Sequence, residues 1–466
     1  MGHYNELSAQ LAREIEAIVD EGRFYIRESM KPDFSHDEKA MYGTAAPEAA
    51  VEVASAEEIA AIMRLCNDAG VPITVRGAGT GLCGGSVAMS GGLVLSMAKM
   101  NKIIALDEDN LTITVEPGVT LQEVMDAAAE KGLCYPPDPG EKTASIGGNL
   151  NTNAGGPRAM RFGATRDYVL AATAVLPTGE IIKLGAPVVK SSNGLNLLQL
   201  VIGSEGTLAV VTELTLKLIP AKKYDISFLM PYESVAEAMS AAIVLKKASL
   251  DPVGLELVAR EFIEFSASFT GEHTLPEDGE ATLIVTFEAN TEDALDMLME
   301  QFAELAEETG PLDILVVDTP TLKRSIWAAH AALNTSIESG VKRFDESDVV
   351  LPMTKVAEYI EAVSELASAM GLTMQVYGHA GDGSLHIFVY NDELEAESFA
   401  SKSAAFMTDS YAKCTELGGV VSGEHGIGHG KKAYLEAALG EDVMGLMRRV
   451  KAAFDPKEIL NPGKVV

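Results

Sequence analysis

Four of the chain's eight histidines lie between positions 379 and 429, and two of them flank a short glycine-rich segment. In the segment 378–386, G-H-A-G-D-G-S-L-H, the Asp382-Gly383 pair favours a two-residue type I′ hairpin turn. With these two residues as the loop, His379 and His386 pair directly across the strands, with Cβ atoms roughly 4.5–5.5 Å apart. Two imidazoles in that arrangement can bind one divalent metal ion.

A third candidate ligand follows in the segment 422–426, S-G-E-H-G, where Glu424 and His425 are adjacent. Two histidines and one carboxylate leave coordination positions open, which is typical of a catalytic rather than a structural metal site. Zinc, iron(II) and manganese(II) all accept nitrogen and oxygen ligands, so the residue types leave the metal open.

Three separate glycine-rich loops form a second group of candidate residues. They are R-G-A-G-T-G at 76–81, S-I-G-G-N at 145–149 with T-N-A-G-G at 152–156, and I-G-S-E-G-T at 202–207. Glycine lets the backbone approach a pyrophosphate closely, with successive N–H groups directed at its oxygens. None of the loops matches G-x-G-x-x-G opening a helix or G-x-x-x-x-G-K-[ST]. Three such loops suit a large, elongated ligand with a diphosphate centre.

These motifs carry a family resemblance that covers nearly the whole chain. In order, R-G-A-G-T-G, P-P-D-P-G, S-I-G-G-N-L-x-T-N-A-G-G and I-G-S-E-G-T-L make residues 45–220 similar to the FAD-binding domain of the vanillyl-alcohol oxidase and p-cresol methylhydroxylase superfamily. Residues 223–466 resemble the C-terminal domain of FAD-linked oxidases. Within the superfamily, the chain resembles bacterial D-lactate dehydrogenases and the flavin subunit of glycolate dehydrogenase; D-2-hydroxyglutarate dehydrogenase is a related member.

The resemblance implies that FAD is the cofactor and that the glycine loops bind it. Members that tether FAD covalently have a histidine after the first glycines, where this chain has Thr80, so we expect non-covalent FAD. The expected cofactor-binding residues are Arg76, Gly77, Ala78, Gly79, Thr80, Gly81, Pro137, Asp138, Ser145, Gly148, Asn149, Thr152, Gly155, Gly156, Glu205, Gly206, Val211 and Asn461.

The same resemblance assigns His379, His386 and Glu424 as metal ligands and His425 as the general base. The implied reaction is oxidation of a small 2-hydroxy acid to the 2-oxo acid, with D-lactate favoured and glycolate or 2-hydroxyglutarate as alternatives. An imidazole with a pKa near 6.5 can remove the hydroxyl proton at neutral pH.

The substrate carboxylate also needs a cationic or polar partner. The family has an arginine three residues after a tryptophan, in W-x-x-R, whereas here His330 follows Trp327 at that spacing. We therefore expect Arg324, His330 and Asn334 to bind the substrate, with the identity of the carboxylate clamp open.

The periodicity of apolar residues indicates which elements carry these groups. We expect a helix over 6–28 and a second one from a Ser55 cap, with Glu58 three residues on, to Gly70. Strands are expected at PITVR and LTITV, a helix from 119 to Gly132, a hairpin with Thr178-Gly179 at its turn, and no regular structure over 136–163.

In the second half, long helices alternate with strands, which indicates an α+β substrate (cap) domain with helices on one face of an antiparallel sheet. We expect an FAD-binding domain over 1–222, the substrate domain over 223–420, and a C-terminal segment, 421–466, that returns to the FAD domain.

Composition narrows the partners of the chain. A net charge of −32 in 466 residues repels nucleic-acid phosphates and favours a partner with a basic docking face.

The N-terminus lacks the features of a signal peptide and no stretch suits a membrane span, so we expect a cytoplasmic protein. The four cysteines show no cluster spacing, so electrons must leave through a partner or a soluble acceptor. Similar subunits pair with an electron-transferring flavoprotein or with iron–sulfur subunits; the oligomeric state, a homodimer included, is open.

Three alternative functions remain at this stage. One is a flavin oxidase that uses oxygen directly, which would release hydrogen peroxide. Another is a carrier flavoprotein without catalysis, against which the metal-ligand pattern argues. The third is a non-redox relative, like the alkyl-glycerone-phosphate synthases.

Overall fold

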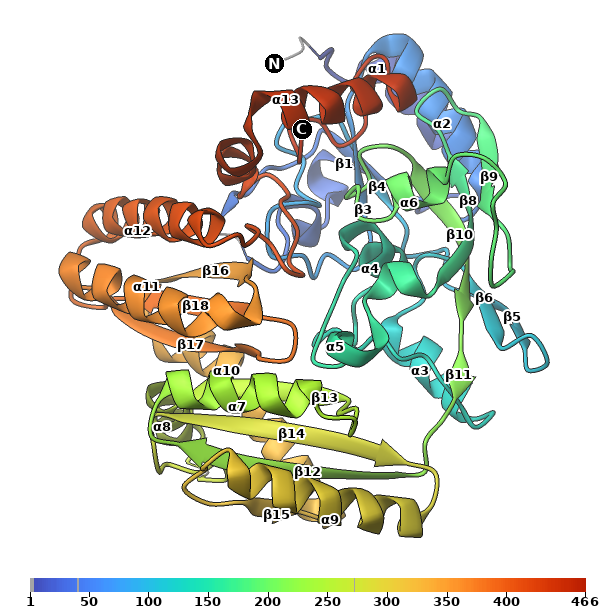
Figure 1. Ribbon diagram of the computed structural model, residues 1–466. Helices are drawn as coiled ribbons and strands as arrows, with labels where there is room; N and C mark the ends of the chain where they lie inside the picture. Colours follow the sequence, from blue (N-terminus) through green and yellow to red (C-terminus); the bar gives the residue numbers. More distant parts are fainter. Residues whose placement is uncertain (1–3, 40–41, 272) are drawn as a thin grey trace. The chain divides into compact units, whose positions relative to one another are not determined.

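The computed structural model describes residues 4–39, 42–271 and 273–466. The chain forms two compact units (Figure 1). The first runs through Gly155 and also includes Ala164–Ala221 and Glu424–Val466. The second comprises Gly156–Gly163 and Lys222–Gly423.

The first unit contains a four-stranded sheet in the order β1-β2-β4-β3, in which β2, β4 and β3 are parallel and β1 is antiparallel to β2. Apolar side chains of α1 and α2 pack with this sheet into one core, which includes Ile15, Ile62, Val51 and Leu95. These elements are β1 (Phe24–Ile26), β2 (Ala49–Glu52), β3 (Ile73–Arg76), β4 (Leu93–Ser96), α1 (Ala9–Glu16) and α2 (Ala56–Ala69).

The capping signals at α2 are confirmed. Ser55 Oγ accepts a hydrogen bond from Glu58 N at 3.2 Å, and Gly70 ends the helix at a φ of +66°. The helix predicted over 6–28 is wrong beyond α1. Gly22 has a φ of +84°, which a helix does not allow, and Phe24–Ile26 pair with β2 as β1.

A second, antiparallel sheet of the first unit has the order β5-β6-β10-β8-β9. The predicted hairpin is confirmed: β8 and β9 pair, and Gly179 has a φ of +88° at the turn between them. The strands are β5 (Ile103–Asp107), β6 (Thr112–Val115), β8 (Val169–Val175), β9 (Ile181–Gly185) and β10 (Val210–Lys217), with the separate pair β7 (Leu133–Cys134) and β11 (Ile219–Pro220).

Helices cover part of the stretch that we expected to be irregular. Residues 136–163 include α4 and α5, so the absence of apolar periodicity did not exclude short helices there. These helices are α4 (Ile146–Thr152), in the first unit, and α5 (Ala159–Phe162), in the second. The first unit also has α3 (Leu121–Ala129), α6 (Leu197–Val201), α13 (Lys432–Phe454) and the 3₁₀ turns Arg27–Ser29, Pro32–Ser35 and Thr165–Asp167.

The second unit is built on one seven-stranded antiparallel sheet in the order β15-β12-β14-β13-β17-β18-β16. The α+β class with an antiparallel sheet is therefore confirmed. The strands are β12 (Tyr224–Tyr232), β13 (Gly254–Ala259), β14 (Ala281–Ala289), β15 (Leu315–Val317), β16 (Phe344–Val350), β17 (Thr373–His379) and β18 (Ser384–Tyr390).

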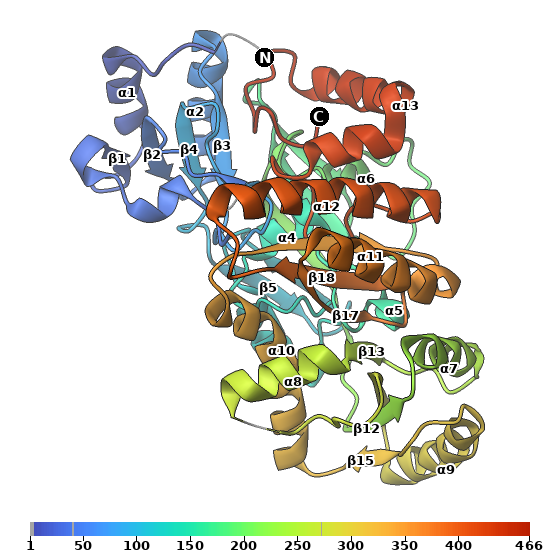
Figure 2. The same cartoon turned by 90° about the vertical axis from the view of Figure 1, so that its left-hand side faces the viewer.

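Helices cover both faces of this sheet, so the expectation of helices on one face was wrong. Ile284 of β14 packs with α8 and α10, whereas Phe287, which points to the other face, contacts Phe302 of α9 with ring centroids 5.0 Å apart. Figure 2 shows α8 and α10 on one side of the strands and α7 and α9 on the other. Central strands buried on both faces, such as β13, need this double cover.

The second unit contains most of the long helices. Among all the described residues, no helix is both long and apolar enough to cross a bilayer. Besides α5, the helices of the second unit are α7 (Val235–Lys247), α8 (Arg260–Thr270), α9 (Glu292–Glu308), α10 (Pro320–Gly340), α11 (Val356–Met370) and α12 (Ala396–Glu416), with the 3₁₀ turn Met353–Lys355.

Candidate active site

In the first unit, the first two glycine loops meet at Ser145, which caps α4. Ser145 Oγ accepts hydrogen bonds from Ala78 N and Gly148 N, each at 3.3 Å. A Cβ on Gly77 would lie 2.2 Å from the same oxygen, so only glycine fits at that position. The two loops therefore form one cradle of backbone groups.

A pocket opens over this cradle and collects residues from all three loops. Buried within the second loop, Asn149 has an Nδ2 without a hydrogen-bond partner among the described residues, a donor that a ligand oxygen would satisfy. The glycine cradle and this donor fit the FAD expected from the sequence. The lining residues are Val75, Gly77, Met97, Pro117, Ser145, Gly147, Gly148, Asn151, Glu205, Gly206, Ala209, Val210 and Val211.

Several of the other expected cofactor residues contact the glycine loops and stabilise their backbone. The guanidinium of Arg76 lies under Gly79, which has a φ of +84°, and donates to His36 O at 2.6 Å. Thr152 Oγ1 donates to Gly148 O at 3.1 Å, and Asp138 pairs with Lys142. Of the rest, Pro137 is buried, Ala78 is exposed, Thr80 and Gly81 are half-buried, and Gly156 belongs to the second unit.

Glu205 joins the third glycine loop to the segment that contains His425. Its carboxylate accepts from Ile427 N and Gly428 N, both at 2.7 Å. Burial raises the pKa of Glu205, although these two N–H groups oppose the shift. Asn461 supports the same loop, since its Nδ2 donates to Glu205 O at 2.7 Å and its Oδ1 accepts from Val75 N at 2.9 Å.

In the second unit, the predicted histidines lie on one face of the sheet, but the predicted register was wrong. His379 pairs with Ser384, and His386 pairs with Tyr377, because the turn holds four residues and Gly383 N donates to His379 O at 2.9 Å. The shift of two residues keeps both imidazoles on the same face, as diagonal neighbours with ring centroids 5.7 Å apart.

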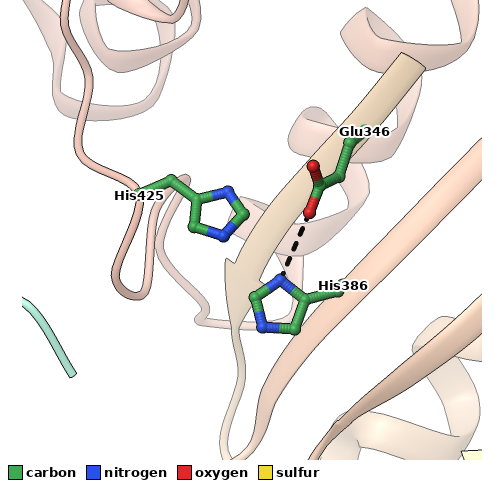
Figure 3. Close-up of side chains that lie close together, drawn as sticks. All are labelled: Glu346, His386 and His425. Carbon is green, nitrogen blue, oxygen red and sulfur yellow. Dashed lines mark ion pairs between the residues drawn. The ribbon is translucent and has the colours of Figure 1, made fainter. Parts of the chain in front are cut away.

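Each histidine has its Nδ1 against a buried glutamate. His379 Nδ1 lies 2.7 Å from Glu256 Oε2 and His386 Nδ1 lies 3.5 Å from Glu346 Oε1, the latter pair drawn in Figure 3. A carboxylate on one ring nitrogen orients the imidazole and leaves the other nitrogen as the metal donor. The two histidines offer ring nitrogens within 4.8 Å of each other, so one ion could contact both.

Sequence reasoning missed Glu256 and Glu346, which face this site from β13 and β16. Burial alone would raise the pKa of Glu256, but the charges and hydrogen bonds of His379 and His330 lower it to about 2. A glutamate inside an otherwise apolar strand, as in G-L-E-L-V-A, was the available signal, because a buried carboxylate requires partners.

The structure places two of the three expected substrate residues near this cluster. His330 Nε2 lies 3.3 Å from Glu256 Oε2, and Asn334 follows one turn later on the same face of α10. Arg324 is exposed, donates to Thr321 on its own helix at 3.3 Å, and is six residues from His330, about 120° around the helix. The structure does not bring Arg324 to the cluster.

Glu424 and His425 begin the last segment of the first unit, directly after Gly423 of the second. Glu424 is half-buried, and a Cβ on Gly155 would lie 3.4 Å from its Oε2, next to one of the glycine loops. At the end of the second unit, just before Glu424, Asp348 accepts hydrogen bonds from Ser422 Oγ at 2.7 Å and Gly423 N at 3.0 Å.

Comparisons with known proteins agree with these features. Residues 222–465 match the model for the C-terminal domain of FAD linked oxidases, and residues 47–185 match an FAD binding domain. The chain is 45% identical to a D-lactate dehydrogenase of Anaerostipes hadrus, over 99% of this chain and 98% of the relative. It is 35% identical to the glycolate oxidase subunit GlcD of Bacillus subtilis, over 93% and 91% of the two chains.

A solved structure of p-cresol methylhydroxylase with substrate bound aligns with a TM-score of 0.80 at 17% identity, over 98% of this chain and 96% of that one. This likeness supports the vanillyl-alcohol oxidase type of fold. The family assignment rests on the model that matches residues 222–465 and on the FAD binding domain that precedes it. The glycine cradle fits the same cofactor. The chain belongs to the FAD-linked oxidases and is an FAD-dependent oxidoreductase.

Proposed function

We propose that the protein oxidises D-lactate, or a similarly small 2-hydroxy acid such as glycolate or 2-hydroxyglutarate, to the 2-oxo acid. The observation that carries the proposal is the pair of histidines on one face of the second unit's sheet, each with Nδ1 against a buried glutamate. The names of the relatives, a D-lactate dehydrogenase and a glycolate oxidase subunit, support this substrate class.

The proposed metal ligands are His379, His386 and Glu424. Chain connectivity supports the third ligand: Gly423 is held by Asp348, which pairs with His386 in the sheet, and Glu424 is the next residue, with its Cα about 3.8 Å further on. A zinc, iron or manganese ion bound there would lower the pKa of a coordinated hydroxyl.

His425 is the proposed general base. It follows Glu424 directly and precedes Gly426, whose φ of +83° turns the chain. A neutral imidazole can remove the hydroxyl proton of the substrate as hydride leaves C2. Bound FAD supplies the two-electron acceptor for that hydride.

His330 and Asn334 are the proposed partners of the substrate carboxylate. A ring N–H of His330 can donate to a carboxylate, and Glu256 Oε2, which lies 3.3 Å from His330 Nε2, orients the ring. Asn334 Oδ1 has no hydrogen-bond partner among the described residues and is buried, which fits a polar ligand there. Arg324 is left out of the proposal because of its exposure.

Electrons would then pass to a protein partner, either an electron-transferring flavoprotein or an iron–sulfur subunit. None of the four cysteines shares a C-x-x-C motif with another, so the sequence has no pattern for a thiolate-bound cluster. The high negative charge suits a partner with a basic docking face.

FAD should be bound without a covalent link, because Thr80 lacks the nucleophilic ring nitrogen through which a histidine could attach it. After acid precipitation and centrifugation, the yellow colour should be in the supernatant. Colour that remains on a washed pellet would contradict this.

The substrate assignment is tested by anaerobic flavin reduction with D-lactate, L-lactate, glycolate and 2-hydroxyglutarate. D-lactate should bleach the flavin fastest. Bleaching by none of the four acids would contradict the proposal, and stoichiometric hydrogen peroxide during aerobic turnover would favour the oxygen-using oxidase.

A further inference from the structure

The residues Ser422–Gly428, here called the EHG loop, contain both the proposed third ligand and the proposed base, yet they form no helix or strand. A loop that places catalytic groups must be held by something outside its own backbone pairing. Two carboxylates contact the EHG loop, one near each end.

The first contact is at the start of the EHG loop. Asp348 of β16 is fully buried, its Oδ2 accepts from Ser422 Oγ, and its Oδ1 accepts from Gly423 N. Just before the loop, Val350 and Val420 exchange backbone hydrogen bonds of 3.2 and 2.9 Å. A Cβ on Gly423 would lie 2.9 Å from Asp348 Oδ1, so the backbone approaches the carboxylate as closely as glycine permits.

The second contact is at the end of the EHG loop, within the first unit. Both oxygens of Glu205 accept backbone N–H groups, from Ile427 and Gly428. Buried Lys431 and Lys464 place positive charge near this carboxylate and oppose the cost of its burial. A Cβ on Gly426 would lie 3.0 Å from Glu205 Oε1, which again requires glycine beside the carboxylate.

We propose that Asp348 and Glu205 are positioning residues, which anchor the two ends of the EHG loop and thereby place Glu424 and His425. This inference rests on the function proposed for Glu424 and His425. Three residues separate the anchored N–H groups of Gly423 and Ile427, so the two contacts flank Glu424 and His425 directly. Carboxylates suit the task because each offers two acceptors and no donor, whereas an amide would turn an N–H group toward another N–H.

The experiment uses the full-length holoenzyme with Glu205→Gln and Asp348→Asn. Matched controls are Glu52→Gln, a buried glutamate paired with Lys31, and Asp345→Asn, on the same strand as Asp348 but bonded to Ser403. The readouts are hydrogen–deuterium exchange of peptides that cover 420–430, bound FAD, and kcat and KM for the substrate that bleaches the flavin.

In Glu205→Gln, we expect faster exchange at residues 427–428 and a fall in kcat of about 10- to 100-fold, with KM and bound FAD within about twofold of wild type. Asp348→Asn should also speed exchange at residue 423, but it should lower kcat less than Glu205→Gln does. The asparagine Oδ1 still accepts one N–H, and Ser422 can turn its hydroxyl away from the new amide. The two controls should match wild type in exchange, bound FAD and kinetics.

Wild-type exchange in both variants would overturn the anchoring, and faster exchange with unchanged kcat would overturn the positioning role. Should Glu205→Gln fail to retain FAD, Glu205→Asp, which keeps the charge on a shorter side chain, is expected to show the same two effects. If the proposed function is wrong, a His425 variant will turn over at the wild-type rate. The exchange measurement does not depend on that result and still tests whether Asp348 and Glu205 hold the EHG loop.

Discussion

Replacing His425 with alanine should lower kcat for D-lactate by about 10²- to 10⁴-fold, the usual contribution of a general base. Without the imidazole, the hydroxyl proton would have to leave to water while hydride departs. FAD should stay bound, because the glycine cradle does not include this side chain. Stopped-flow bleaching of the flavin under anaerobic conditions measures the reductive step directly.

His429→Ala is the matched control for this prediction. His429 lies four residues further along, is exposed, and contacts Cys83 through its backbone N–H, so its side chain should not affect the rate. Near-normal bleaching in the His425 variant, or an equal loss in both variants, would remove His425 from the role of base.

His386→Ala should remove bound metal and lower kcat by at least about 100-fold. His386 is 2% exposed. Glu346 contacts its ring nitrogen, and Tyr377 stacks on the ring with centroids 4.8 Å apart. Metal content per protein, measured after dialysis, should fall together with the rate. Glu346→Gln should weaken metal binding by a smaller factor, about 10- to 100-fold, because it removes only the orienting carboxylate.

His273→Ala supplies the control, since this histidine is exposed and pairs with Glu277 on the surface. It should keep both metal and activity. A His386 variant that is inactive but retains a full complement of metal would place the ion elsewhere and leave His386 with a different role.

The prediction that the two histidines share a face of the sheet was correct, although the predicted register was wrong. Side chains alternate along a strand, so a register shift of two residues changes the partner but preserves the face. Asp382-Gly383 indicated a two-residue turn, whereas the backbone N–H groups of both residues bond back to His379 O and make a longer one. Local propensity located the turn but not its length.

The glutamates that orient the histidines could not be assigned from sequence. Glu256 lies directly opposite His379, more than a hundred residues earlier in the chain, because β13 pairs with β17. That pairing depends on the order of seven strands, which periodicity does not reveal. Similarly, Arg324 matched the required charge, but its position relative to His330 on α10 turns it away from the site.

The glycine loops were predictable because their function is local. Gly77 and Gly79 are needed where a Cβ would meet Ser145 and the Arg76 guanidinium, and that requirement is visible as composition. The second function of Glu205, as an acceptor for the EHG loop, arises from contacts more than 200 residues apart and is visible only in the fold.

The central claim is that a metal ion held by the two histidines assists oxidation of a 2-hydroxy acid by FAD. Its most direct test is stopped-flow reduction of the flavin by D-lactate, with chelator-treated enzyme compared with the same enzyme reloaded with zinc, iron(II) or manganese(II). The account predicts that bleaching slows by at least about 100-fold without metal and recovers with at least one of the three ions. Equally fast bleaching in the metal-free enzyme, with FAD fully bound, would contradict it.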